Sequence, residues 1–222
     1  MKKCLLAIAL LATVLPFNAA FADTILAENG GHVAFNQIPF GSDSGDSRYQ
    51  EVYSSSLFNG PVEITSLAFS PQDSILYSAN VDLRMTVTNV GVGNLTSDLD
   101  SNFTIPLTTV FSNPNFSENL TGGSESFSLV FNFTTPFIYD PAQGNLLLDL
   151  AISDQNVAEA FSRSGDGPNI SRAYNTAGFG DGADGVGLRT LIGFEPVPEP
   201  GTFVLLGSGL LGLAGTLRRK LM

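Results

Sequence analysis

The sequence predicts an all-β protein whose main domain is an antiparallel two-layer β-sandwich of jelly-roll-like form. Three observations support this fold class: apolar and polar residues alternate along the body of the chain, turn-rich segments separate the alternating runs, and no twelve-residue window there has a convincing helical stripe. Because neighbouring side chains of a strand point to opposite faces, each run offers one apolar face for burial. With 17 Phe in the chain, we expect a core rich in phenylalanine between the two sheets.

Three runs are the longest strand candidates, and turn signals such as Asn113-Pro114 separate the candidates from one another. They are Val81–Thr88, Ser126–Thr134 and Asn145–Ser153. In the last two, the alternate apolar residues that should face the core are Phe127, Leu129, Phe131, Phe133, Leu146, Leu148, Leu150 and Ile152. Shorter candidates are Gln50–Tyr53, Glu63–Phe69, Phe103–Val110 and Val186–Gly193, and Asn156–Phe161 offers one or two helical turns.

The length of 222 residues suits one domain, residues 23–196, with an appendage at each end. All 21 acidic side chains and only five of the ten basic ones lie between Asp23 and Glu199, so this part of the chain carries a formal charge of −16. Binding to nucleic acid needs clustered Lys and Arg, which the domain lacks. We therefore expect no nucleic-acid partner.

Residues 1–22 have the three parts of a secretory signal peptide in order. Two lysines follow Met1, an apolar run comes next, and the small-residue site formed by Ala20 and Ala22 predicts cleavage after Ala22. The apolar run is short for a membrane span. The only cysteine, Cys4, lies in this segment, so the mature domain should contain neither a disulfide nor a cysteine metal ligand.

Residues 202–217 are sixteen uncharged and mostly apolar residues, and the basic tail that follows, residues 218–222, contains Arg218, Arg219 and Lys220. A helix of this length reaches about 24 Å, which is shorter than the roughly 30 Å hydrocarbon core but long enough to insert if the basic side chains snorkel. The positive-inside rule predicts that the basic tail stays in the cytoplasm. The acidic domain should then lie outside the inner membrane.

Val197, Pro198, Glu199 and Pro200 stand directly before the predicted transmembrane helix. Together with that helix and the basic tail, residues 197–222 resemble the PEP-CTERM sorting signal in all three parts and in their order. The two prolines favour an extended chain, so the triplet should be accessible at the bilayer surface. A plain single-span anchor with a proline-rich hinge is the alternative interpretation.

The resemblance implies a partner and a location. In this family an exosortase, an integral-membrane transpeptidase, recognises the tail and removes it in or near the Pro-Glu-Pro triplet. The hosts are typically Gram-negative bacteria that make exopolysaccharide. The protein would be anchored transiently in the inner membrane, and then be released or joined to another molecule at the cell surface or in the extracellular matrix.

No catalytic constellation stands out in the predicted domain, and we expect no catalytic residue. His32 is the only histidine, and the nearest candidate nucleophile, Ser44, does not fit a G-x-S-x-G elbow because Asp43 occupies the serine position. One histidine without cysteine also argues against ordinary zinc and iron sites. A pair of carboxylates for glycoside hydrolysis stays open, because the distance between two acids cannot be read from the sequence.

One glycine-rich stretch, residues 178–185, is the candidate metal site. Asp181 and Asp184 lie on it, and Asp166 in a neighbouring Gly-rich turn is a third candidate ligand. Ca²⁺ prefers carboxylate and carbonyl oxygens in flexible geometry, which makes calcium the one candidate cofactor. The spacing does not match an EF-hand, and a surface loop without a metal is the alternative.

These features favour a non-enzymatic surface or matrix protein that associates with exopolysaccharide or biofilm. The first alternative is a carbohydrate-binding module that stacks sugars on exposed tyrosines, although the chain contains no Trp. The candidate tyrosines are Tyr49, Tyr53, Tyr77, Tyr139 and Tyr174. The second alternative is a glycoside hydrolase that uses two carboxylates.

Overall fold

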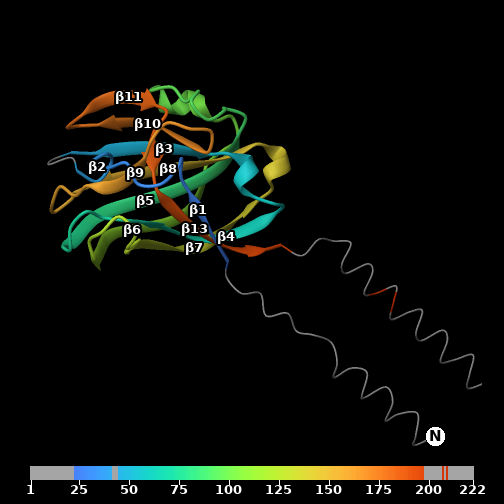
Figure 1. Ribbon diagram of the computed structural model, residues 1–222, viewed down its shortest axis with the longest axis horizontal. Coiled ribbons are helices and arrows are strands. Elements are labelled where there is room, and N and C mark those ends of the chain that lie inside the picture. Colours follow the sequence, from blue (N-terminus) through green and yellow to red (C-terminus); the bar gives the residue numbers. More distant parts are fainter. Residues whose placement is uncertain (1–22, 42–44, 198–206, 208, 210–222) are drawn as a thin grey trace, which may run out of the picture.

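The computed structural model describes residues 23–41 and 45–197, together with Gly207 and Gly209, and it confirms the all-β class (Figure 1). All strand pairs between the described strands are antiparallel. The predicted signal peptide, most of the predicted transmembrane helix and the basic tail lie outside the described residues. Within the described part of the chain, no helix is long and apolar enough to cross a membrane.

The smaller main sheet has four strands in the order β1-β13-β4-β7. It joins the first and last described strands, because Asp23 of β1 pairs with Phe194 of β13. Figure 1 shows these two strands side by side in front of the other main sheet. The strands are β1 (Asp23–Ala27), β13 (Thr190–Pro196), β4 (Val62–Phe69) and β7 (Leu129–Tyr139).

The larger main sheet has six strands in the order β11-β10-β3-β8-β5-β6. Strand β8 therefore lies in the middle, between β3 and β5. The strands are β11 (Gly180–Asp184), β10 (Ile170–Thr176), β3 (Ser47–Tyr53), β8 (Asn145–Ser153), β5 (Leu76–Thr88) and β6 (Thr108–Asn119).

A third sheet of three short strands, in the order β12-β9-β2, completes the described part of the fold. Its residues Phe161 and Leu188 join the same core as the two main sheets. The strands are β12 (Gly187–Leu188), β9 (Phe161–Ser164) and β2 (Ala34–Asn36). The 3₁₀ turns are η1 (Ser55–Leu57), η2 (Leu99–Asn102) and η3 (Pro141–Gln143).

The two main sheets pack on a common core, as the alternating pattern predicts. Phe69 of β4 and Phe131 of β7 have ring centroids 6.2 Å apart, and Phe40 lies 5.7 Å from Phe69. Offset and tilted aromatic pairs of this kind add to the free energy gained by burying their area. Description of the sandwich as a jelly roll stays a prediction.

Strand β8 is buried on both faces, which the alternation does not predict. Its even-numbered residues from Leu146 to Ile152 face the main core, as expected, but Leu147 and Asp149 on the other face are also fully buried. The loop of residues 89–107, which we call the cover segment, packs on that face. Leu95 and Leu99 of the cover segment form a second apolar cluster with Val52, Leu147 and Ala173.

Several expected strand limits are wrong. The expected strand Phe103–Val110 lies mostly in the cover segment, and β6 begins at Thr108. The expected turn at Asn113-Pro114 lies inside β6 instead. Proline cannot donate to a sheet, but β6 is an edge strand and its register with β5 shifts between the partners Ala79 and Val81, so no paired N–H is lost there.

Three further expectations differ from the structure. Phe127 lies before β7 with a positive φ of 39°, so it does not continue the alternation of that strand. Residues 156–160 form no helical turn, and β9 begins at Phe161. The run Val186–Gly193 is divided between β12 and β13 at Arg189. The sequence reasoning also missed β1, β2, β9, β10 and β11, which are short or rich in polar residues and glycine.

Candidate functional site

A row of three polar residues crosses the middle of the six-stranded sheet on its outer face. Gln50 of β3 lies directly opposite Asp149 of β8, and Asp149 lies directly opposite Arg84 of β5. Side chains in register on neighbouring strands point to the same face, so all three point away from the main core. The cover segment lies over part of this row.

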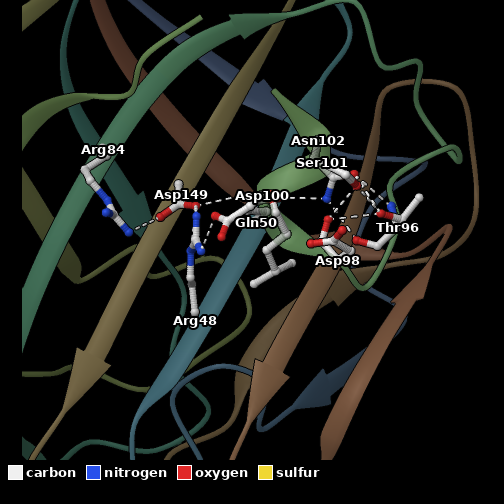
Figure 2. Close-up of polar contacts among 10 residues, drawn as sticks. Arg48, Gln50, Arg84, Thr96, Asp98, Asp100, Ser101, Asn102 and Asp149 are labelled. Carbon is white, nitrogen blue, oxygen red and sulfur yellow. Dashed lines mark hydrogen bonds and ion pairs between the residues drawn. The ribbon is translucent and has the colours of Figure 1, made fainter. Parts of the chain in front are cut away.

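Asp149 is a fully buried carboxylate that accepts four hydrogen bonds (Figure 2). Its Oδ2 accepts from Nε and Nη2 of Arg48 at 2.9 and 2.7 Å and from Nε2 of Gln50 at 2.6 Å. Its Oδ1 accepts from Nη2 of Arg84 at 2.5 Å. Burial of a carboxylate is costly unless it is paired, and two guanidinium groups supply the pairing here.

Asn102 and Gln50 connect this carboxylate to the cover segment. Asn102 donates from Nδ2 to Gln50 Oε1 at 2.9 Å, and Gln50 Nε2 donates to the carbonyl oxygen of Leu99 at 3.0 Å. Asp100, whose side chain is 77% exposed, pairs with Arg48 Nη1 at 2.7 Å. We call these six residues the outer cluster: Arg48, Gln50, Arg84, Asp100, Asn102 and Asp149. Figure 2 shows it running from β5 to η2.

The outer cluster holds a buried carboxylate among donors from the two neighbouring strands. Three of the four hydrogen bonds to Asp149 go to Oδ2 and one goes to Oδ1, and the carboxylate is fully buried, so neither oxygen is open to solvent as a general base. Arg84 Nε is buried without a hydrogen-bond partner among the described residues. Sequence reasoning missed this cluster, although one charge inside the apolar run of β8 was a usable signal.

A groove of about 270 Å³, which we call the outer groove, lies beside the outer cluster, and most of the residues that line it have polar side chains. Its middle row is set by register: Asp82 of β5, Ala151 of β8, Arg48 of β3 and Asn175 of β10 stand side by side. The small side chain of Ala151 lies at the bottom of the groove and leaves space above it. The other polar residues that line the groove are Asp46, Ser47, Asn80 and Ser153.

Among the described acids, Glu51 has the most strongly raised pKa, but its carboxyl group is buried in the core. Burial raises its pKa to about 8, while the hydroxyl of Tyr49 and the backbone N–H of Leu188 donate to its Oε2 and oppose this rise. Its Oε1 has no hydrogen-bond partner. A Cβ on Gly187 would lie only 2.8 Å from that oxygen, so the neighbouring strand closes over the carboxyl group. A substrate has no access to it.

The one histidine forms a pair that the sequence reasoning did not predict. His32 Nδ1 lies 2.8 Å from Oγ of Ser162, and the ring packs against Phe35 at a centroid distance of 4.7 Å. Ser162 is fully buried in β9, so its hydroxyl is not exposed as a nucleophile. The earlier candidate, Ser44, lies outside the described residues.

The structure does not bring the predicted calcium ligands together. Asp181 and Asp184 lie in strand β11, and their spacing of three places them on opposite faces of that strand. Asp184 already accepts from Nε and Nη2 of Arg172 at 2.9 and 3.0 Å. Asp166 lies beside Gly185. Among the described residues, no three His, Cys, Asp or Glu side chains gather in a way that could hold a metal ion.

Four of the five tyrosines that were expected to be exposed for sugar stacking are buried. Tyr49, Tyr53, Tyr77 and Tyr139 are all fully buried, because each lies on the core face of its strand. Tyr174 is half-buried, and the guanidinium of Arg172 lies 5.2 Å from its ring centroid. The four buried rings therefore offer no open face of the kind that sugar stacking needs.

The sorting signal begins where the described fold ends. Pro196, the last residue of β13, pairs with Val62 of β4, and the backbone N–H of Val197 donates to the carbonyl oxygen of Pro61 at 3.2 Å. Residues 198–200 lie outside the described part of the chain, as do Arg218, Arg219 and Lys220. The folded domain therefore extends to the residue before the Pro-Glu-Pro triplet.

Comparison with known proteins identifies this segment. The family model of the PEP-CTERM protein-sorting motif matches residues 196–220. No curated protein matches the chain significantly. Among solved structures, the chain is similar to one titled "Structure of infectious bursal disease virus Gt strain", with 15% identity, a TM-score of 0.23 and coverage of 82% of this chain. The chain spans 38% of the length of that viral chain.

The fold and the motif together define an all-β protein with a C-terminal sorting signal. More specifically, the chain carries a PEP-CTERM protein-sorting motif at residues 196–220, which confirms the resemblance seen in the sequence. Such a motif implies export, a membrane-anchoring sorting region and an exosortase as the processing enzyme.

Proposed function

We propose that this protein is a non-enzymatic component of the bacterial surface or extracellular matrix, displayed after an exosortase removes its tail. In this proposal the β-sandwich is the functional part, and it associates with exopolysaccharide or biofilm outside a Gram-negative cell. The sorting motif supports the exported location and the processing. The association with polysaccharide is our inference from the outer groove.

The position of the two ends of the folded domain is the observation that carries the proposal. Asp23, the first described residue, pairs with Phe194, and Val197 is bonded to Pro61 beside them. Both ends of the domain thus lie at one end of the sandwich, which we call the terminal pole. Cleavage after Ala22 and within the triplet would leave all thirteen described strands in the product.

Intact-mass analysis of the mature protein from its native host tests the processing. The expected product begins at Asp23 and lacks the tail from Arg218 onward, with any attached glycan or lipid appearing as added mass. A strain without the exosortase should retain the tail and serves as the control. Mature protein that still carries Arg218 to Met222 in an exosortase-positive host would contradict the proposal.

The absence of a catalytic role is argued from access. The side chains of Asp149, Glu51 and Ser162 are fully buried, and none of the three presents a reactive atom to solvent. Turnover of polysaccharides or aryl glycosides by the purified protein would overturn this part. Loss of such turnover in Asp82→Asn would then point to the outer groove.

The outer groove favours direct saccharide binding, which would be the molecular basis of the proposed association with polysaccharide. It presents carboxylate, amide and guanidinium groups from four neighbouring strands, which are suited to accept from and donate to sugar hydroxyls. Because Asp46 and Asp82 line it and the domain is strongly acidic, a neutral saccharide fits better than an anionic one.

Affinity electrophoresis in gels that contain the host's own neutral polysaccharide tests this saccharide binding. We expect retardation of the wild-type protein and weaker retardation of Asp82→Ala and Asn175→Ala. Asn115→Ala on the exposed edge strand β6 is the matched control. Equal mobility of the wild type with and without polysaccharide would count against binding in the groove.

A further inference from the structure

A second groove, of about 490 Å³, lies at the terminal pole. We call it the pole groove. Strand β1, the segment from Leu57 to Val62 and the end of β13 form it. Its surface is mostly apolar, with the nearly buried rings of Phe58 and Phe194 among its lining and the exposed Asp23 and Asn59 at its rim.

The sorting triplet follows this groove without a spacer. Val197 is itself a lining residue of the pole groove. Its backbone N–H donates a hydrogen bond to the carbonyl oxygen of Pro61, another lining residue. Because Val197 directly precedes Pro198 in the sequence, an enzyme that binds the triplet works beside the terminal pole of the folded domain.

We propose that the pole groove is a docking surface for the exosortase that removes the tail. The inference rests on the proposed processing and adds to it a recognition surface on the folded domain, outside residues 196–220. The partner is the extracytoplasmic face of that membrane enzyme. An apolar lining that includes Val197, the residue before the triplet, is suited to receive an apolar loop from the enzyme.

Negative charge at the terminal pole argues against a lipid surface as the partner that contacts the pole groove. Asp23 is at the groove rim, and Glu63 and Glu195 stand directly opposite each other on β4 and β13, one residue before the end of their pairing. Three carboxylates at one pole are repelled by an anionic lipid surface. A protein partner with an apolar contact and basic flanks suits this pole better.

Gly60 allows a sharp test. A Cβ on Gly60 would meet no atom within 4 Å, and its φ is not positive, so Gly60→Arg should fold while its side chain fills the pole groove. Asn59→Arg, at an exposed neighbour, is the second variant. Gly165→Arg is the matched control, because a Cβ there makes only an ordinary 3.6 Å contact and Gly165 is bonded to Asn29, beyond the far end of β1.

The full-length chain and its variants are expressed in the native host, and the tail-bearing fraction is followed by pulse-chase and intact mass. We expect Gly60→Arg and Asn59→Arg to slow tail removal by about tenfold or more, as for a blocked interface centre, while Gly165→Arg is processed like the wild type. Resistance of each tail-bearing chain to added protease reports folding.

The outcomes separate the two proposals. If the wild-type chain keeps its tail, the processing itself is wrong. If the wild type is processed and both folded groove variants are processed at the same rate, the docking surface is wrong. Unchanged processing together with loss of a dimer, or with altered binding to anionic vesicles, would assign the groove to a second copy or to lipid and would equally overturn the inference.

Discussion

Asp149 shows how one residue fixes the outer face of the larger sheet. It stands in the central strand, it is fully buried, and it receives donors from both neighbouring strands. Arg48 and Arg84 remain about 30% exposed, so their outer atoms stay hydrated while their inner atoms bond the carboxylate. This arrangement keeps a charge in the interior at tolerable cost.

We expect Asp149→Asn to lower the free energy of unfolding by about 3 kcal/mol, because it leaves two guanidinium groups without their shared carboxylate. Urea denaturation measures the change. Asp100→Asn is the matched control: its side chain is 77% exposed, and we expect a loss below about 1 kcal/mol. Equal effects of the two substitutions would show that burial of Asp149 has no energetic weight.

Glu51 predicts a dependence of stability on pH. Burial raises its pKa from 4.5 to about 8 in the folded protein. Between these two values the folded state holds a proton that the unfolded state releases, so stability falls as the pH rises through this window. Below the lower value the group no longer contributes to the slope, and above about 8 the loss is complete.

Glu51→Gln removes this titration, because the amide resembles the protonated acid in shape. We expect the variant to gain stability over the wild type on going from pH 5 to pH 9, by an amount on the order of a few kcal/mol. Thermal unfolding at a series of pH values is the measurement. Glu118→Gln on exposed β6 is the control for the loss of one acidic side chain, and a wild-type slope retained in Glu51→Gln would refute the assignment.

At the level of elements, strand β8 and the cover segment show that the outer face of the larger sheet is partly buried. An alternating strand in a two-layer sandwich normally has one solvated face. In this protein Leu147 on the outer face is buried by Leu95 and Leu99, which fold back from the loop between β5 and β6. The loop therefore acts as a partial third layer, and its residues Asp100 and Asn102 join the outer cluster.

Leu99→Ala should lower the free energy of unfolding by about 2–3 kcal/mol, since the side chain is 6% exposed and its removal leaves a cavity over Leu147. Amide hydrogen exchange should increase in residues 89–107 before it increases in β4 or β13. Leu76→Ala is the control, because that leucine is 51% exposed. Uniform loosening of both sheets would contradict an independent cover segment.

The predictability of the strands depended on their place in the sheets. Asn145–Ser153 was predicted with the limits that β8 has, because a central strand carries a strong apolar alternation. The edge strands β6 and β7 were misjudged, since edges tolerate Pro114 and Pro136 and expose polar residues. Strand β11 was taken for a loop because Gly and Asp are poor strand formers.

At the scale of the whole molecule, the folded domain ends at the terminal pole, where the sorting signal begins. All described strand pairing ends at Pro196, one residue before Val197. We expect the processed and the tail-bearing protein to unfold at midpoints within about 3 °C of each other in the same detergent, because cleavage in the triplet removes no strand. Scanning calorimetry of both forms is the measurement, and a markedly lower midpoint for the processed form would show that the tail stabilises the domain.

The sequence by itself determined the all-β class, the acidic character of the domain and the sorting motif. Alternation and a short motif are read from neighbouring residues, and net charge is read from composition, so none of these features depends on which strands pair. Only the tertiary structure decided that four of the five tyrosines are buried, that Asp181 and Asp184 point apart, and where Asp149 and the two grooves lie. These features depend on the order of the strands and on which loop covers which face of a sheet. The contacts that create them join residues far apart in the sequence, such as Arg48 and Asp149, which are about a hundred positions apart.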